Sequence, residues 1–133
     1  MRIRLFGRIT TVLTPGNLTI ALLYGTGADA NGVSIVASAP QTLLASQTDL
    51  AWMVELYVQC RSIGPTGTLF ATGLAHFNPA VIAVGHFLLP GSAPAPSGAC
   101  DLTAPLILSV QALRSGSTAE TMQVHDTQVE AVS

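Results

Sequence analysis

The stretch that decides the fold lies near the middle of the chain, Leu50–Gly67, and reads LAWMVELYVQCRSIGPTG. Two sets of residues alternate in it, Trp52, Val54, Leu56, Val58 and Cys60 in one and Met53, Glu55, Tyr57, Gln59 and Arg61 in the other. This period of two predicts a long strand with one buried face and one partly solvent-exposed face. Gly64–Gly67 (GPTG) then reverses the chain. The stretch therefore predicts a β-hairpin with Trp52 on its buried face.

Further strand-like runs follow at nearly even spacing, separated by turns rich in Gly, Pro and Ser. The predicted ranges are Arg2–Leu13, Leu18–Tyr24, Val33–Ala37, Pro40–Leu44, Thr68–Phe77, Ala80–Leu89, Leu102–Leu113 and Thr121–Val132. We expect the first two to pair as a hairpin, and Gly7 to mark a bulge or a close contact. Loops are predicted at Gly25–Gly32 and Ser115–Ala119. About eight short strands predict an all-β chain, a single antiparallel β-sandwich that is jelly-roll-like.

Length and composition fit one domain with very few charges. The chain has 133 residues, so a single domain over 1–133 would bury about two-thirds of its unfolded surface. Apolar residues make up 49% and charged residues only 9%, against roughly 25% charged residues in an average soluble domain. The surface therefore consists largely of small uncharged residues, or partners cover it.

The charge pattern argues against two classes of partner. The chain has no lysine and a net charge of -2, so it lacks the basic footprint that nucleic-acid binding requires. The most apolar window, Ala80–Leu89, is too short to span a membrane. We expect neither partner. Arg2, Arg4 and Arg8 share one face of the first strand. They could bind an acidic neighbour, but we favour a solvated or subunit-facing strand edge.

The apolar content exceeds what a solitary sandwich of this size needs. Ala80–Val84 is apolar on both faces of its predicted strand, which suggests an interface between subunits of a closed oligomer. The predicted oligomer or capsid interface comprises Arg2, Arg4, Arg8, Val81, Ile82, Val84 and Phe87.

No residue pattern indicates catalysis, a cofactor or a metal. The histidines, His76, His86 and His125, lack a second ligand at strand or helix spacing, although one histidine near the axis of a homotrimer could supply three ligands. The aspartates at loops and strand starts are expected to cap turns, and no nucleophile elbow or phosphate-binding loop occurs. Cys60 and Cys100 are expected to be free thiols, with Cys60 buried. We expect a protein that is not an enzyme.

Aromatic residues leave a binding role open. Those that could stack on a sugar are Tyr24, Tyr57, Phe6 and Phe77. Tyr57 lies on the face opposite Trp52, which favours its exposure. The sequence therefore keeps recognition of a host surface glycan as an alternative function.

The order of these motifs resembles the small β-sandwich proteins of tailed-bacteriophage virions, the capsid decoration and head-fibre proteins. The matching stretches are Arg2–Thr11, Thr14–Thr19, Trp52–Leu56, Arg61–Thr68, Asp101–Thr103, Leu106–Val110 and a final strand ending at Glu130. Two segments depart from the pattern, because Ala80–Pro90 is more apolar and Pro90–Gly98 is longer than in the family.

The resemblance implies a jelly-roll-like fold, assembly as a homotrimer, no enzyme activity and attachment to the major capsid protein or another virion protein. The expected location is the exterior of the phage capsid, after assembly in the host cytoplasm. The alternative is a module at a tail or fibre tip that binds a host glycan.

Overall fold

A computed structural model describes residues 1–25, 32–116 and 119–132 of the chain. The predicted loops Gly25–Gly32 and Ser115–Ala119 therefore lie partly or mostly outside the described residues. The described part contains nine strands, β1 (Arg2–Thr10), β2 (Asn17–Gly25), β3 (Val33–Ala37), β4 (Gln41–Thr42), β5 (Leu50–Ser62), β6 (Thr68–Phe77), β7 (His86–Leu89), β8 (Ile107–Ser115) and β9 (Thr121–Glu130).

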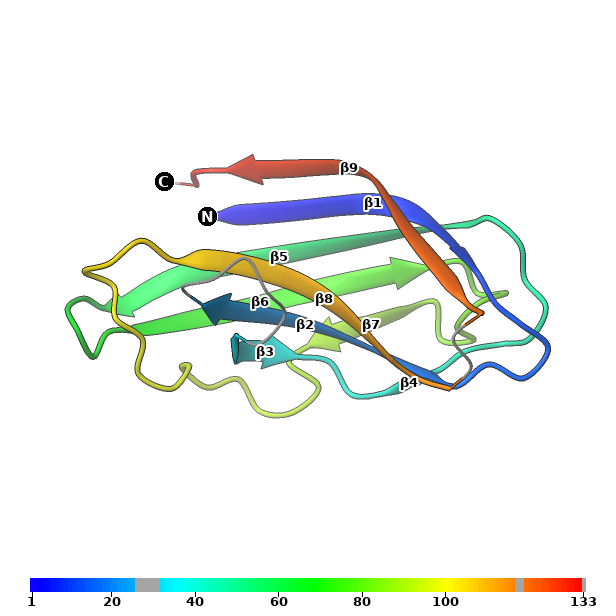
Figure 1. The fold of residues 1–133 in the computed structure, drawn as a ribbon, viewed down its shortest axis with the longest axis horizontal. Coiled ribbons are helices and arrows are strands. Elements are labelled where there is room, and N and C mark those ends of the chain that lie inside the picture. The colour runs from blue at the N-terminus through cyan, green and yellow to red at the C-terminus, as the bar shows by residue number, and fades with distance from the viewer. Residues whose placement is uncertain (26–31, 117–118, 133) are drawn as a thin grey trace.

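The strands form two antiparallel sheets that enclose one apolar core (Figure 1). The first sheet has five strands in the order β7-β6-β5-β1-β9. In the second sheet β2 is central, with β8 along one side and β3 and β4 along the other. The all-β antiparallel sandwich is thus confirmed, while the jelly-roll connectivity stays a prediction.

The central hairpin is confirmed as β5 and β6. Trp52 lies opposite Phe77 in the register, and their rings stack with centroids 6.1 Å apart in the core. The turn begins at Gly64, whose φ of +109° favours glycine. The prediction that Cys60 is buried is wrong, because the last residues of β5 extend past the core. Cys60 is exposed, Cys100 is buried, and both are free thiols.

The predicted hairpin of the first two strands is wrong. β1 lies between β5 and β9 in the first sheet, whereas β2 is central in the second sheet. Each strand has an apolar face, and these faces pack across the core rather than side by side, so that Ile9 and Leu18 are both almost fully buried. The Thr14–Asn17 turn therefore carries the chain from one sheet to the other.

Gly7 confirms both of its predicted roles. The pairing of β1 with β9 shifts register between Phe6 and Gly7, which is a β-bulge. A Cβ atom at Gly7 would lie 1.8 Å from the Gln123 carbonyl oxygen and 2.7 Å from the Trp52 ring. Only glycine allows β9 and the tryptophan to approach β1 this closely.

The predicted strand over Ala80–Leu89 is wrong in its first half, because residues 80–85 form turns and β7 begins only at His86. The Asn78 side chain accepts the backbone N–H of Ala80 at 2.9 Å, and Gly85 ends the segment with a φ of +70°. Val81 and Ile82 are buried in the core of their own chain.

This changes the argument for an interface along that segment. Val81, Ile82 and Phe87 need no partner to cover them, and only Val84 remains largely exposed. A turn places side chains in several directions. An apolar run in a turn is therefore no evidence for a strand that is apolar on both faces. An interface at Val84 and the arginines stays a prediction.

Candidate functional site

The most distinctive surface of the molecule is an open apolar groove between β8 and β9. The end of β8 and the start of β9 lie close together, where Arg114 donates to the Glu120 carbonyl, and the two strands diverge from there. β1 and β9 therefore lie beyond β8, the outer strand of the second sheet (Figure 1). Two cavities, of about 170 Å³ and about 390 Å³, follow this opening and share Leu5, Val110 and Val124. We call the continuous depression the β8–β9 groove.

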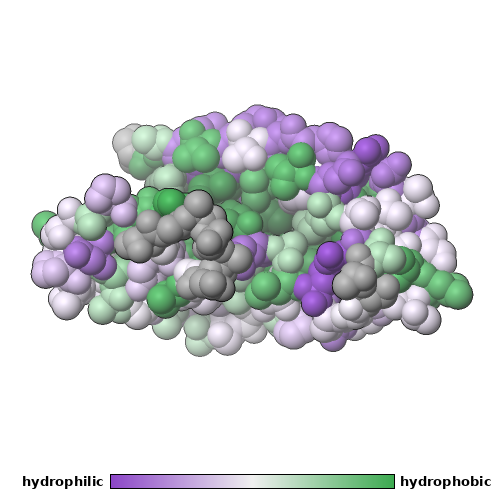
Figure 2. All heavy atoms as spheres, viewed as in Figure 1, coloured by the Kyte–Doolittle hydropathy of each residue, from purple (hydrophilic) through white to green (hydrophobic). Residues whose placement is uncertain are grey.

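The groove is lined by side chains of the inner faces of both sheets. Its floor is Ile3 and Leu5 of β1, and its walls include Leu108 and Val110 of β8. Figure 2 shows apolar atoms gathered in this hollow, below a polar rim. Ile3 and Leu5 on the floor are only 6% and 9% exposed among the described residues, so the opening is shallow over β1.

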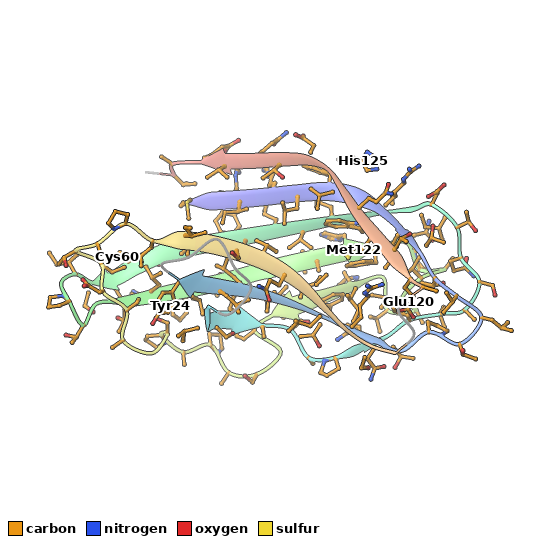
Figure 3. The ribbon with its side chains drawn as sticks, in the orientation of Figure 1. Tyr24, Cys60, Glu120, Met122 and His125 are labelled. Atoms are coloured by element: carbon orange, nitrogen blue, oxygen red, sulfur yellow. The ribbon has the colours of Figure 1, made fainter. Side chains whose placement is uncertain are left out.

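β9 makes the exposure of this inner face clear. Val124 and Val129 both line the groove, yet they are 55% and 61% exposed. Met122 lies near the turn, where the groove narrows, while His125 projects outward at the bulge (Figure 3). Valines that point inward but remain this exposed lack a covering layer.

A buried carboxylate, that of Glu120, lies at the narrow end of the groove. Glu120 is 2% exposed, and its Oε1 accepts the backbone N–H of Gly16 at 3.2 Å. Arg114 at the end of β8 donates to the backbone carbonyl of Glu120, and its Nη1 lies 3.8 Å from the carboxylate. These contacts join the start of β9 to β8 and to Gly16, so we assign Glu120 a structural role.

A second depression of about 450 Å³ lies on the outer face of the first sheet, over β5 and β6. We call it the outer cleft. Tyr57 is 41% exposed at its wall, as its strand face predicts, and Leu88, Pro90 and Pro94 lie around it. An open cleft with one accessible tyrosine ring offers a surface on which a sugar could stack.

Glu55 supplies the charge beside this ring. The Tyr57 hydroxyl donates to Glu55 Oε1 at 2.9 Å, and Arg4 donates to the other carboxylate oxygen. The hydrogen bond from Arg4, followed by that from Tyr57, holds the pKa of Glu55 below its ordinary value, although partial burial opposes the shift. Glu55 is the single carboxylate among the described residues that line the cleft, so the geometry suits recognition better than paired acid–base chemistry.

The arginines that were expected on a strand edge lie on a central strand instead. β1 has β5 on one side and β9 on the other, and Arg2, Arg4 and Arg8 each reach an acidic residue on a neighbouring segment. Their partners are Glu130, Glu55 and Asp49 respectively. These ion pairs give each of the three arginines an acidic partner within its own chain.

Two of the three histidines lie closer to each other in the structure than their separation in the sequence suggested. His76 and His86 are directly opposite each other in the pairing of β6 with β7, and their ring centroids are 6.3 Å apart. This proximity depends on the register of two strands, which no local pattern contained. In the described residues no group of three or more His, Cys, Asp or Glu side chains is placed to hold a metal ion.

Two of the predicted sugar-stacking residues are unavailable. Tyr24 is 9% exposed, and its hydroxyl donates to the Ala99 carbonyl at 2.6 Å. Burial raises the pKa of Tyr24. Phe77 is 4% exposed between Trp52 and Phe87. Both residues belong to the core.

Comparison of the chain with protein-family models, with curated proteins and with solved structures finds no match. Among the described residues, no helix is long and apolar enough to cross a membrane.

Proposed function

We propose that this chain is a non-enzymatic structural protein of a tailed-bacteriophage virion, which decorates or stabilises the outer surface of the capsid as an oligomer. Its partners are copies of itself, a homotrimer by resemblance, and the major capsid protein or another virion protein. Its motifs resemble those of decoration and head-fibre proteins, whose role is to bind and not to catalyse.

The observation that carries the proposal is the β8–β9 groove. Val124 and Val129 point toward the inner face but are more than half exposed, which supports the proposal that another protein layer covers them. A virion component meets that need, because each copy is surrounded by further copies and by the shell. Repeated modest contacts then add up through multivalency.

Low charge supports the same proposal. Charged residues are 9% of the chain, and four of its five basic residues, Arg2, Arg4, Arg8 and Arg114, lie within ion-pair distance of acidic residues. A surface with few free charges suits contacts based on shape and apolar area, as in permanent assemblies.

Electron cryomicroscopy of intact particles tests this proposal. Mass spectrometry of purified particles is expected to find the chain, and reconstruction is expected to place two-layered β density on the outer surface of the shell. Purified particles that lack the chain, from a host that synthesises it, would contradict the proposal.

A specific observation favours a second function, recognition of a host surface glycan. The outer cleft presents the accessible ring of Tyr57 beside Glu55, whose carboxylate Arg4 holds in place. Aromatic stacking plus oriented hydrogen-bonding groups is the usual composition of a sugar site.

A glycan array probed with the purified protein separates the two functions. If the cleft binds sugar, Tyr57→Ala should weaken binding about tenfold, which corresponds to roughly 1.4 kcal/mol. Gln59→Ala is the matched control, because Gln59 is exposed on the same face of β5 but does not line the cleft. An array without binding, or equal binding by both variants, would reject the glycan function.

A further inference from the structure

The two sheets of this sandwich do not match in width. The first sheet has five strands side by side, whereas the second has β2 with β8 on one side and β3 and β4 sharing the other. The surplus lies at β1 and β9, which extend beyond β8 (Figure 1). At this side the described residues of the second sheet include no strand opposite β1 and β9.

The groove also has two strand edges along its sides. β8 pairs with β2 and β9 pairs with β1, and neither pairs with a further strand in the described part of the chain. Edge strands of this length are templates for pairing with another chain unless charges, proline or irregular backbone protect them. Ile107–Leu113 of β8 contains no charged residue and no proline, whereas the β9 edge carries Asp126, Glu130 and the bulge at His125.

We propose that a second copy of this chain fills the β8–β9 groove, with the β9 edge of one copy paired to the β8 edge of the next. The inference deepens the self-association proposed above, and it does not depend on attachment to a capsid. The first support for this pairing of β9 with β8 comes from the directions of the two strands. β8 runs toward the turn that precedes β9, and β9 runs back from it, so the two strands are antiparallel in one chain (Figure 1).

A copy rotated about an axis parallel to the strands keeps its strand directions. Its β9 therefore arrives antiparallel to the β8 of the first copy, which is the orientation of every strand pair in this protein. Successive copies can repeat this contact until the ring closes, with two or three members. In a closed ring every β8 edge and every β9 edge is paired.

The side chains support the same arrangement. Val124 and Val129 of the incoming β9 would face Ile3 and Leu5 on the floor of the groove. The incoming strand would also continue the second sheet past Leu108 and Val110 of β8. The contact would remove from water Val124 and Val129, which are 55% and 61% exposed in a single chain, whereas Ile3 and Leu5 are already 6% and 9% exposed.

Two other occupants fit the groove less well. Pairing of β9 with the β9 of a second copy would extend the first sheet sideways, but it would leave the inner faces of Val124 and Val129 uncovered. A small ligand needs an enclosed pocket with a few converging polar groups. The larger half of the groove is a long opening whose lining has one polar side chain, Thr127.

Hydrogen exchange measured at micromolar and at near-millimolar protein concentration tests the junction. Amides in Ile107–Leu113 and Val124–Glu130 should exchange at least tenfold more slowly at the high concentration, because pairing closes both edges. Val129→Asp should remove this protection and leave a folded single chain, since Val129 is 61% exposed within one copy.

Leu88→Asp is the matched control, because Leu88 is 67% exposed on β7, at the opposite edge of the same sheet. It should keep the concentration-dependent protection. An oligomer whose β8 and β9 amides exchange at the same rate at both concentrations would overturn the junction while leaving self-association intact. A single chain at every concentration would overturn both.

Discussion

The two long sides of this sandwich differ in how the sheets meet. On the side of β3 and β7, backbone hydrogen bonds join segments of the two sheets, from Leu44 to Val81 at 2.7 Å and from Gly91 to Ala37 at 3.0 Å. The turn that contains Ile82 fills the space between them. On the side of β8 and β9, the two strands are not paired with each other, and the inner face is open.

Because of this difference, inward-pointing apolar side chains are buried on one side of the sandwich and exposed on the other. Val81 and Val124 are both valines of the interior by orientation, but Val81 is fully buried and Val124 is 55% exposed. On the closed side, the inward-pointing apolar residues are covered by other residues of the same chain. On the open side, the inward-pointing Val124 and Val129 stay more than half exposed within one chain.

The largest effect is expected on the closed side, from Ile82→Ala. Ile82 is 2% exposed in the core, so its truncation should lower the free energy of unfolding by about 2–5 kcal/mol through a cavity. Urea denaturation measures the change. Val84→Ala, two residues away at a site that is 59% exposed, should stay within about 0.5 kcal/mol of the wild type. Equal losses in the two variants would show that the closed side is not packed as described.

Gly7→Ala should have the next largest effect, because the added methyl group meets the Gln123 carbonyl and the Trp52 ring. We expect a loss of about 1–3 kcal/mol in the free energy of unfolding, together with displacement of β9. Gly98→Ala is the control, since a Cβ there meets no atom within 4 Å. A Gly7→Ala variant as stable as Gly98→Ala would refute the close contact of β1 with β9.

A smaller effect is expected from Glu55→Gln on the outer face, at most about 1 kcal/mol, because Glu55 and Arg4 form a partly exposed ion pair. Hydrogen bonds hold the pKa of Glu55 below its ordinary value of 4.5 in the folded chain. The carboxylate therefore contributes stability above that value, and the contribution disappears as the pH falls through the folded pKa. Urea denaturation at a series of pH values should show the gap between wild type and variant closing in acid. A gap that widens in acid would contradict the assignment.

The smallest effect is expected on the open side, from Val124→Ser in solutions dilute enough to contain single chains. The free energy of unfolding should change by no more than about 0.5 kcal/mol. The same substitution at the fully buried Val81 should cost about 2 kcal/mol or more. Similar losses at both valines in dilute solution would mean that the groove is covered within one chain.

The sequence predicted the local elements of this fold well. Alternation around Trp52 identified β5 and its buried face, and Gly7 was identified correctly as a bulge. These features depend on residues that are close in the sequence, where periodicity and glycine content carry the information. The exposure of Tyr57 also followed from its place in the alternation.

The long-range features required pairings that the sequence alone did not contain. β1 pairs with β5 and β9 rather than with β2, and the cross-strand contact of His76 with His86 depends on the register of β6 and β7. Val124 and Val129 are five positions apart, so strict alternation places them on opposite faces, and only the bulge in the pairing of β1 with β9 brings both to the groove. The β8–β9 groove was missed for that reason.

The central claim is that copies of this chain complete each other at the open side of the sandwich. Size-exclusion chromatography with light scattering measures it most directly. At near-millimolar concentration the wild type should have the mass of a closed oligomer, and the double variant Val124→Asp/Val129→Asp should elute as a folded single chain of about 13.7 kDa. A wild-type chain that remains at the single-chain mass up to near-millimolar concentration would contradict the claim.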